Sequence, residues 1–224
     1  AAADILSSTM ALSAVLMALL RRETTGRGDY IDMAMMDALM AAVPNNMGPV
    51  LADKRAPVVK HERPWGGNAM YRIYATKDGR HVVLGGAEMH FARNVLEALG
   101  RPDLLALCEP PPGPHQDPVK HFLAATFRTR TQAEWVEFFA TVECPFAPVK
   151  TMREAADDPQ VRARRMIVED ERGWEHLGTP LKFQDEPGQP NFTFPNLGQH
   201  TEEIVHDLGF NDAEIAAMRE SGVF

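Results

Sequence analysis

The first 22 residues, AAADILSSTMALSAVLMALLRR, constrain the fold more than any other stretch of the sequence. They predict a helix from Asp4 to about Glu23 whose apolar residues fall on all sides. A helix of this kind is buried, because every face needs an apolar neighbour. We therefore expect a core helix that other elements cover on all sides. Arg21 and Arg22 lie in the expected last turn, where positive charge interacts favourably with the helix dipole, and Gly26 is the expected C-terminal end of the helix.

A membrane span or a signal peptide fits this stretch less well. A span needs about 20 predominantly apolar residues, whereas residues 5–20 are fewer and contain four hydroxyl side chains. A signal peptide has a basic start and a cleavage site after its apolar run, and neither is present. We expect no membrane association. The sequence also has no initiator Met and starts almost in a core helix, which is typical of a piece of a longer protein.

Asp4 is the single charge at the start of this helix, and two interpretations are open. Aspartate is a favoured N-cap residue, and the capping hydrogen bond contributes about 1 kcal/mol. A carboxylate at a helix N-terminus is also stabilised as an anion by the helix dipole. An anionic carboxylate is what a nucleophile or a general base requires. The two interpretations are compatible with each other.

The composition is that of a globular protein with room for one large domain or two small ones. The net charge of −8 over 224 residues argues against a surface that binds nucleic acid. Cys108 and Cys144 form neither a disulfide framework nor a metal-binding pattern. They fit a reducing cytoplasm, and the histidines lack metal-site spacing, so we expect no metal. Cys144 lies in a run that is typical of structure, not of a nucleophile.

Hydrophobic periodicity divides the remainder into segments. Residues 28–36 alternate as a strand does, and a short helix follows until Pro44. Residues 44–68 are rich in proline and glycine and predict a linker. Residues 69–165 predict a compact α+β unit: a hairpin that turns at Asp78-Gly79, then helices over 87–100, 117–127 and 131–142, an extended stretch and a helix from 151. Residues 166–224 predict a return segment that ends in two short helices, the first starting at Thr201.

Four stretches in this order resemble the class III CoA-transferase family (the CaiB/BaiF type), which includes the α-methylacyl-CoA racemases. They are LLRRETTGRGDYIDMAMMDAL, YATKDGRHVVLGGAEMHF, ECPFAPVKTMREAADDPQVRAR and LGQHTEEIVHDLGFNDAEIAAMRESGV. Because family members are roughly twice as long, the sequence resembles their C-terminal half. The missing N-terminal half of the same protein is then an expected partner.

The resemblance implies an α/β fold. Residues 1–43 would belong to the Rossmann-like large domain that binds CoA, and residues 69–165 would form the smaller α+β domain. Residues 166–224 would return to pack on the large domain. Members are typically homodimers in which two chains interlock, so a second copy of the chain is another expected partner.

The resemblance also implies a reaction. Asp4 occupies the position of the catalytic aspartate, which carries CoA between an acyl-CoA and a carboxylic acid as an aspartyl-CoA thioester. Gly66 and Gly67 occupy the place of the glycine-rich loop that shields this intermediate. An ordinary turn is the alternative explanation for the two glycines. Coenzyme A would enter as acyl-CoA, and the small-molecule partners would be acyl-CoA and a carboxylic acid.

Two alternatives remain open. An α-methylacyl-CoA racemase would use Asp4 and Glu88 as acid/base groups, although Met89 stands where racemases generally have proline. Glu88 could equally be a first-turn acid of the following helix. The second alternative is an inactive half-protein that lacks the N-terminal CoA site. Two histidines are assigned no role, because His90 should face away from Glu88 and His61 has no local support. The stripe Trp135, Phe138 and Phe139 predicts core packing.

Overall fold

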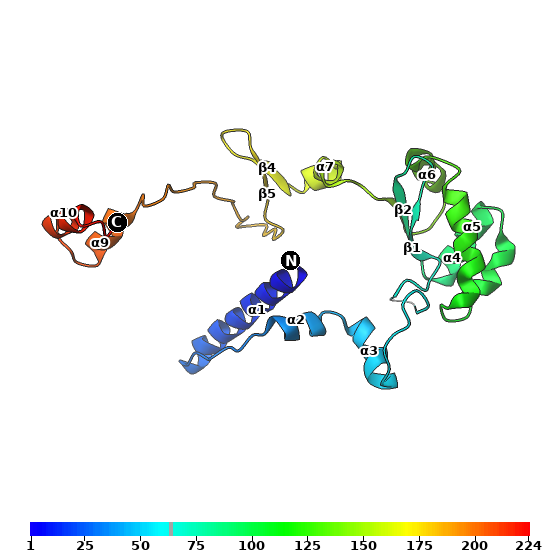
Figure 1. Ribbon diagram of the computed structural model, residues 1–224, viewed down its shortest axis with the longest axis horizontal. Coiled ribbons are helices and arrows are strands. Elements are labelled where there is room, and N and C mark those ends of the chain that lie inside the picture. The colour runs from blue at the N-terminus through cyan, green and yellow to red at the C-terminus, as the bar shows by residue number, and fades with distance from the viewer. Residues whose placement is uncertain (63–64) are drawn as a thin grey trace. The chain divides into compact units, whose positions relative to one another are not determined.

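The computed structural model describes residues 1–62 and 65–224, which divide into two compact units, 1–149 and 150–224 (Figure 1). Both helices and strands are present, so the expected mixed α/β class is confirmed. Positions 63 and 64 of the predicted linker lie outside the described residues.

Helix α1 (Ala2–Thr25) opens the first unit and ends as predicted at Gly26. Gly26 has a φ of 67°, and its N–H donates to the Arg22 carbonyl oxygen at 2.8 Å. This left-handed conformation is accessible to glycine without a Cβ clash. The helix therefore stops where the sequence provides a glycine, which adopts this conformation at little steric cost.

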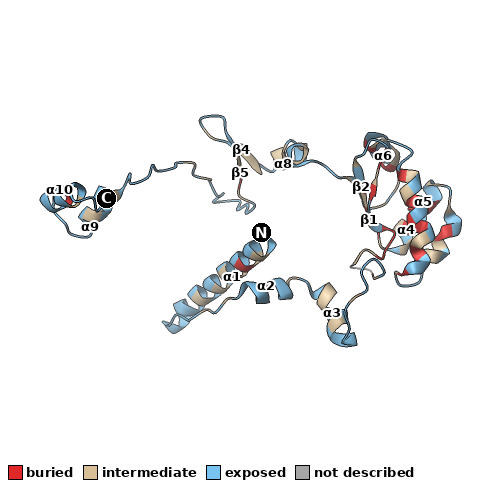
Figure 2. Cartoon of the chain, viewed as in Figure 1, coloured by how far each residue is buried: buried red, intermediate tan, exposed pale blue. Residues whose placement is uncertain are grey.

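The apolar surface of α1 is largely exposed, which contradicts the expected cover on all sides. Only Ser7 of this helix is buried, and Leu20 is 73% exposed (Figure 2). The physical reason is that α1 packs on α2 (Met35–Ala41), and one short neighbour cannot cover a helix that is apolar on every face. In the described residues, α1 has the length and the mean hydropathy, 1.8, to cross a membrane. A core helix passes the same test, so the expectation of no membrane association stays a prediction.

The segment between α1 and α3 differs from two sequence predictions. The strand expected over residues 28–36 is absent there: residues 27–34 are irregular, and α2 begins at Met35. An alternating segment becomes a strand only with a hydrogen-bonded neighbour. The predicted linker contains helix α3 (Pro44–Asp53). Pro44 suits the first turn of this helix, where a backbone N–H is not needed.

A three-stranded antiparallel sheet organises the rest of the first unit. Strand β1 (Tyr71–Ala75) pairs with β2 (His81–Gly85) in the predicted hairpin, with Tyr71 opposite Gly85, and β2 pairs with β3 (Phe146–Pro148). Gly79 has a φ of 75° in the turn. The helical elements after the hairpin are α4 (Met89–Ala98), η2 (Pro102–Cys108), η3 (Pro114–Gln116), α5 (Asp117–Phe127) and α6 (Gln132–Phe139).

Aromatic side chains join these helices to the sheet. Trp135 on α6 is buried, and its indole N–H donates to the Phe127 carbonyl oxygen at 2.8 Å. The Phe127 ring lies 5.2 Å from the Tyr74 ring and 6.0 Å from the Phe139 ring. Phe138 packs against the edge of this cluster. The expected core role of the stripe on α6 is therefore confirmed.

Before β1, backbone hydrogen bonds connect residues 58–62 to residues 65–67. The Lys60 N–H donates to the Trp65 carbonyl oxygen at 2.7 Å, and the Gly67 N–H donates to the Glu62 carbonyl oxygen at 2.8 Å. Gly66 has a φ of 86°. A Cβ on Gly67 would lie 2.4 Å from the His61 carbonyl group. Both glycines are therefore required by the backbone of this turn.

The second unit begins with α7 (Met152–Ala156) and α8 (Pro159–Ala163), where one helix was expected. Pro159 cannot continue a helix but suits the first turn of a new one. Strands β4 (Ile167–Glu169) and β5 (Glu175–Leu177) form a hairpin, and the chain ends in α9 (Thr201–Asp207) and α10 (Asp212–Glu220). Thr201 lies within α9 and makes no capping hydrogen bond, because His200 occupies the N-cap position.

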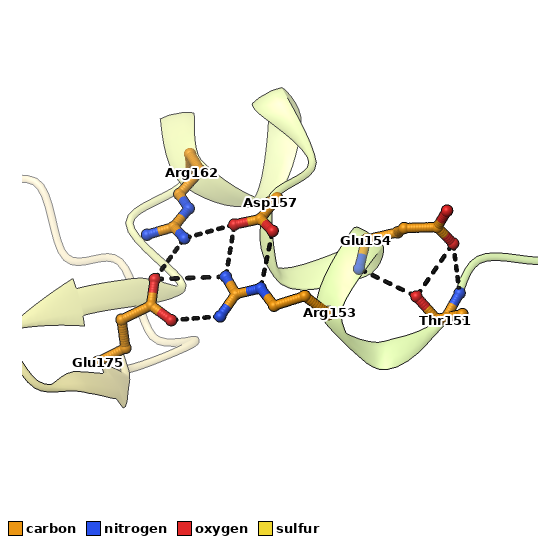
Figure 3. A network of polar contacts seen from close by, with 6 residues as sticks. All are labelled: Thr151, Arg153, Glu154, Asp157, Arg162 and Glu175. Carbon is orange, nitrogen blue, oxygen red and sulfur yellow. Dashed lines mark hydrogen bonds and ion pairs between the residues drawn. The ribbon is translucent and has the colours of Figure 1, made fainter.

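Four charged side chains connect α7, α8 and β5 (Figure 3). Arg153 Nε donates to Asp157 Oδ2 at 2.7 Å, and Arg162 Nη2 donates to Asp157 Oδ1 at 2.8 Å. Both arginines also pair with Glu175. Hydrogen bonds from these arginines lower the pKa of Asp157 to about 2, and they also lower the pKa of Glu175. Two cations thus share two carboxylates across three elements.

Replacing Gly67 by alanine is expected to destabilise the first unit by about 1–3 kcal/mol, because the new Cβ would collide with backbone atoms. The buried residues Asn68, Ala69 and Met70 follow directly, so a displaced turn disturbs the core. Gly28→Ala is the matched control, with open space and no positive φ, and should change stability by less than about 0.5 kcal/mol. Urea denaturation followed by circular dichroism tests this. Equal stability of the two variants would contradict the described turn.

The charge network predicts a pH dependence in the second unit. Asp157 has a folded pKa of about 2, against about 3.9 in an unfolded chain. Its stabilising contribution is therefore present above about pH 4 and is lost as the pH falls toward 2. NMR titration should find the Asp157 pKa near 2 in the native protein and nearer 4 in Arg153→Gln. Arg164→Gln, which removes an exposed charge on α8's C-terminal side, should leave the titration unchanged.

Candidate functional site

Asp4 lies in the first turn of α1 and its side chain is 71% exposed. Because the helix begins at Ala2, Ala1 occupies the N-cap position, and the expectation that Asp4 caps the helix is wrong. Asp4 Oδ2 lies 3.9 Å from the Ala1 amino nitrogen. The Asp4 carbonyl oxygen accepts hydrogen bonds from Ser7 Oγ at 3.1 Å and from Ser8 Oγ at 2.7 Å. The backbone of Asp4 is thus fixed while its carboxylate faces solvent.

The position of Asp4 leaves its carboxylate accessible to solvent. The first-turn N–H groups of a helix lack acceptors within the helix, and the dipole places partial positive charge there. In the described residues, no side-chain donor forms a hydrogen bond with the carboxylate of Asp4. An exposed anion at a helix start can attack an electrophile or remove a proton.

Glu88 occupies the N-cap position of α4, one residue earlier than the predicted first-turn position. Its backbone is extended, with φ −75° and ψ 141°, and its side chain makes no capping hydrogen bond. Gly86 precedes it at a close approach, because a Cβ there would lie 2.8 Å from Phe91 Cβ. The connection from β2 to α4 is therefore tight, and it presents the Glu88 carboxylate at the surface.

Gly66 and Gly67 are explained by the turn that precedes β1. The Gly66 carbonyl oxygen accepts a hydrogen bond from Arg72 Nη1 at 3.2 Å, and Gly67 is buried. The positive φ and the close backbone approach account for both residues without a ligand. Their predicted role as a shield for a reaction intermediate stays a prediction.

The contacts of the described chain do not join the candidate residues into one site. Across residues 1–62 and 65–224, no hydrogen bond or ion pair links Asp4, Glu88 and the glycine pair. Each residue is positioned by its own local element. Their roles as one catalytic group therefore stay predictions.

His90 and Cys144, which are assigned no catalytic role, are positioned by local packing. His90 is exposed and contacts the neighbouring Phe91 ring. Cys144 packs beside the core, and burial raises its pKa to about 11. A thiol with this pKa is protonated at neutral pH, which fits a structural residue. The described residues contain no group of three or more His, Cys, Asp or Glu arranged for a metal.

A cationic cavity that no sequence motif predicts lies between β1, α5 and the turn over residues 58–62. Its volume is about 410 Å³, and its basic lining residues are Lys60, His61, Arg72, Lys120, His121 and Arg128. They come from three separate segments, so no short motif contains them. A partial signal exists in α5 and the residue after it, where Lys120, Ala124 and Arg128 recur at intervals of four and share one helix face.

The sequence model of CoA-transferase family III matches residues 1–201. Succinyl-CoA–L-malate CoA-transferase beta subunit of Chloroflexus aurantiacus is 28% identical over 99% of this chain and 57% of its own length. Human alpha-methylacyl-CoA racemase is 27% identical over 93% of this chain and 55% of its own. The crystal structure of a CAIB/BAIF family protein from Brucella suis superimposes with a TM-score of 0.69 at 24% identity, covering 92% of this chain and 55% of that one.

These similarities run through nearly the whole chain, although the chain spans about half the length of the curated relatives it matches. The family match includes α1 with Asp4, the turn with Gly66 and Gly67, and the start of α4 with Glu88. The chain belongs to CoA-transferase family III.

Proposed function

We propose that the protein containing this chain transfers CoA between an acyl-CoA and a carboxylic acid, with Asp4 as the covalent nucleophile. The observation that carries the proposal is an exposed carboxylate at the start of α1, within a family match that covers residues 1–201. A relative is named a CoA-transferase. The reaction requires such a carboxylate, because only the ionised form attacks a carbonyl carbon.

The proposed reaction proceeds by exchange of acyl groups on Asp4. The carboxylate attacks the thioester carbonyl carbon and CoA leaves as a thiolate, which gives a mixed anhydride. The thiolate then attacks the aspartyl carbonyl carbon and releases the first carboxylate. The acceptor carboxylate attacks the resulting aspartyl-CoA thioester, and the same two steps run in reverse. The covalent relay replaces one difficult exchange by several easier ones.

A second candidate is racemisation at the carbon next to the thioester. Human alpha-methylacyl-CoA racemase is among the relatives, and Glu88 offers an exposed carboxylate that makes no capping hydrogen bond. In this reaction Asp4 and Glu88 would remove and return the α-proton from opposite faces of the substrate. Neither residue would form a covalent bond to the acyl group.

The exposed apolar surface of α1 supports a larger assembly as part of the proposal. Leu16, Met17 and Leu20 are each more than half exposed in the described chain. We include in the proposal a Rossmann-like large domain that covers this surface, and a homodimer of interlocked chains. Burial of such a surface is favoured by about 25 cal/mol per Å².

Hydroxylamine trapping tests the covalent step. The full-length protein is incubated with an acyl-CoA and quenched with hydroxylamine, and peptide mass mapping should find a hydroxamate at Asp4. Asp4→Asn should abolish the adduct and lower the transfer rate by roughly 10³-fold or more, because the nucleophile is lost. Asp37→Asn, a first-turn acid of α2, is the matched control and should retain the adduct. An adduct that persists in Asp4→Asn would rule out this nucleophile.

Solvent deuterium exchange separates the two candidates. Racemisation predicts deuterium at the substrate α-carbon, and Glu88→Gln should slow its incorporation by roughly 10²–10⁴-fold. Glu97→Gln, an exposed change on α4, should leave the rate unchanged. Transfer through Asp4 predicts no deuterium at that carbon. Deuterium incorporation without any Asp4 adduct would therefore replace the transferase proposal by the racemase.

A further inference from the structure

We propose that the cationic cavity of the first unit binds the phosphate group of a small molecule. The cavity lies where β1, α5 and the turn over residues 58–62 meet, and its volume of about 410 Å³ falls in the range of small-molecule sites. Figure 1 shows β1 and α5 next to each other in this unit, and they are in contact. The proposal does not depend on the transferase reaction, since it concerns residues to which that reaction assigns no role.

The charge of the lining is the first argument. Six basic side chains face the cavity: Lys60, His61, Arg72, Lys120, His121 and Arg128. Asp117 is the acidic side chain among the lining residues. With the histidines neutral, four cations face one carboxylate, which leaves a formal charge of +3. The whole chain has a net charge of −8, so the local charge of the cavity has the opposite sign to the net charge of the chain. A concave basic surface focuses the field and attracts anions.

The pairing of these charges is the second argument. Lys120 is buried, and its Nζ donates to Asp117 Oδ1 at 2.9 Å. Asp117 is therefore already paired, and the hydrogen bond from Lys120 lowers its pKa. Within the described residues, Lys60, Arg72 and Arg128 form no ion pair with a carboxylate. Three cations of the cavity thus lack a counterion among residues 1–62 and 65–224.

The rigidity of the walls is the third argument. Arg72 lies on β1 and its Nη1 donates to the Gly66 carbonyl oxygen at 3.2 Å. The turn that carries Lys60 and His61 is held by the Lys60–Trp65 backbone hydrogen bond. Lys120 Nζ also lies 3.5 Å from the Lys60 carbonyl oxygen, which connects the turn to α5. Cations that are held before the ligand arrives lose little entropy on binding.

The chemistry of the cations favours phosphate. A guanidinium donates two parallel hydrogen bonds to an oxyanion, and ammonium groups add strong charge-assisted bonds. A doubly charged phosphate fits a cavity with a surplus of +3. The small volume of the cavity and the negative net charge of the chain argue against an extended nucleic acid.

Binding measurements on the full chain test the site. Isothermal titration with inorganic phosphate, AMP and adenosine is expected to show binding of the two phosphates and none of adenosine. Lys60→Gln and Arg128→Gln remove exposed cations, and each should weaken phosphate binding about tenfold, the effect of losing one charge-assisted contact. Arg93→Gln removes an exposed charge on α4, outside the cavity, and should leave the affinity unchanged. Circular dichroism confirms that each variant is folded.

The outcomes separate the ligand sources and the alternatives. Tighter binding of AMP than of inorganic phosphate supports a phosphate ester as the ligand, and equal or weaker binding of AMP supports free phosphate. The proposal is overturned if neither phosphate binds below about 10 mM. It is also overturned if Arg93→Gln weakens binding as much as the two cavity variants, because attraction would then come from the overall field.

Discussion

The hydrogen bond from the Trp135 indole N–H to the Phe127 carbonyl oxygen fixes the core of the first unit, on which the cationic cavity at its surface depends. It joins the end of α5 to α6, while the Phe127 ring packs on Tyr74 of β1. An indole N–H left without an acceptor in this core would cost about 1–3 kcal/mol. The bond therefore holds α6 against α5, and the Phe127–Tyr74 ring contact holds α5 against β1, which forms one wall of the cationic cavity. The surface chemistry of the unit follows from its core packing.

The first unit contains one region whose apolar side chains are buried and one whose apolar side chains are exposed. Around the sheet, apolar side chains cover one another and leave Val82, Leu96 and Leu123 with 0% exposure. Helix α1 packs on α2, but most of its apolar side chains are exposed in the described chain. The cost of exposing apolar surface is proportional to its area. The proposed large domain and second chain would therefore supply the largest share of the stabilisation of α1.

The candidate residues are presented by helix starts and by a turn. Asp4 lies in the first turn of α1, and Glu88 directly precedes α4. Helix N-termini favour anions, which explains why carboxylates persist there without side-chain partners. The glycine pair has a different origin, because Gly67 permits the backbone at His61 to approach where a Cβ would collide. The same turn places Lys60 at the cavity, so the need for glycine at position 67 also determines where the Lys60 charge lies.

The sequence by itself determined the elements whose signals are local. The Asp78-Gly79 hairpin, the end of α1 at Gly26 and the aromatic stripe on α6 each depend on residues a few positions apart. The resemblance to the family also predicts roles for Asp4 and Glu88, and these roles stay predictions. Only the tertiary structure decided the unpaired segment before α2, the exposure of α1 and the cavity that joins Lys60, Arg72 and Arg128. These features depend on which distant segments meet, because strand pairing, burial and a shared electrostatic field arise from neighbours in space and not from neighbours in sequence.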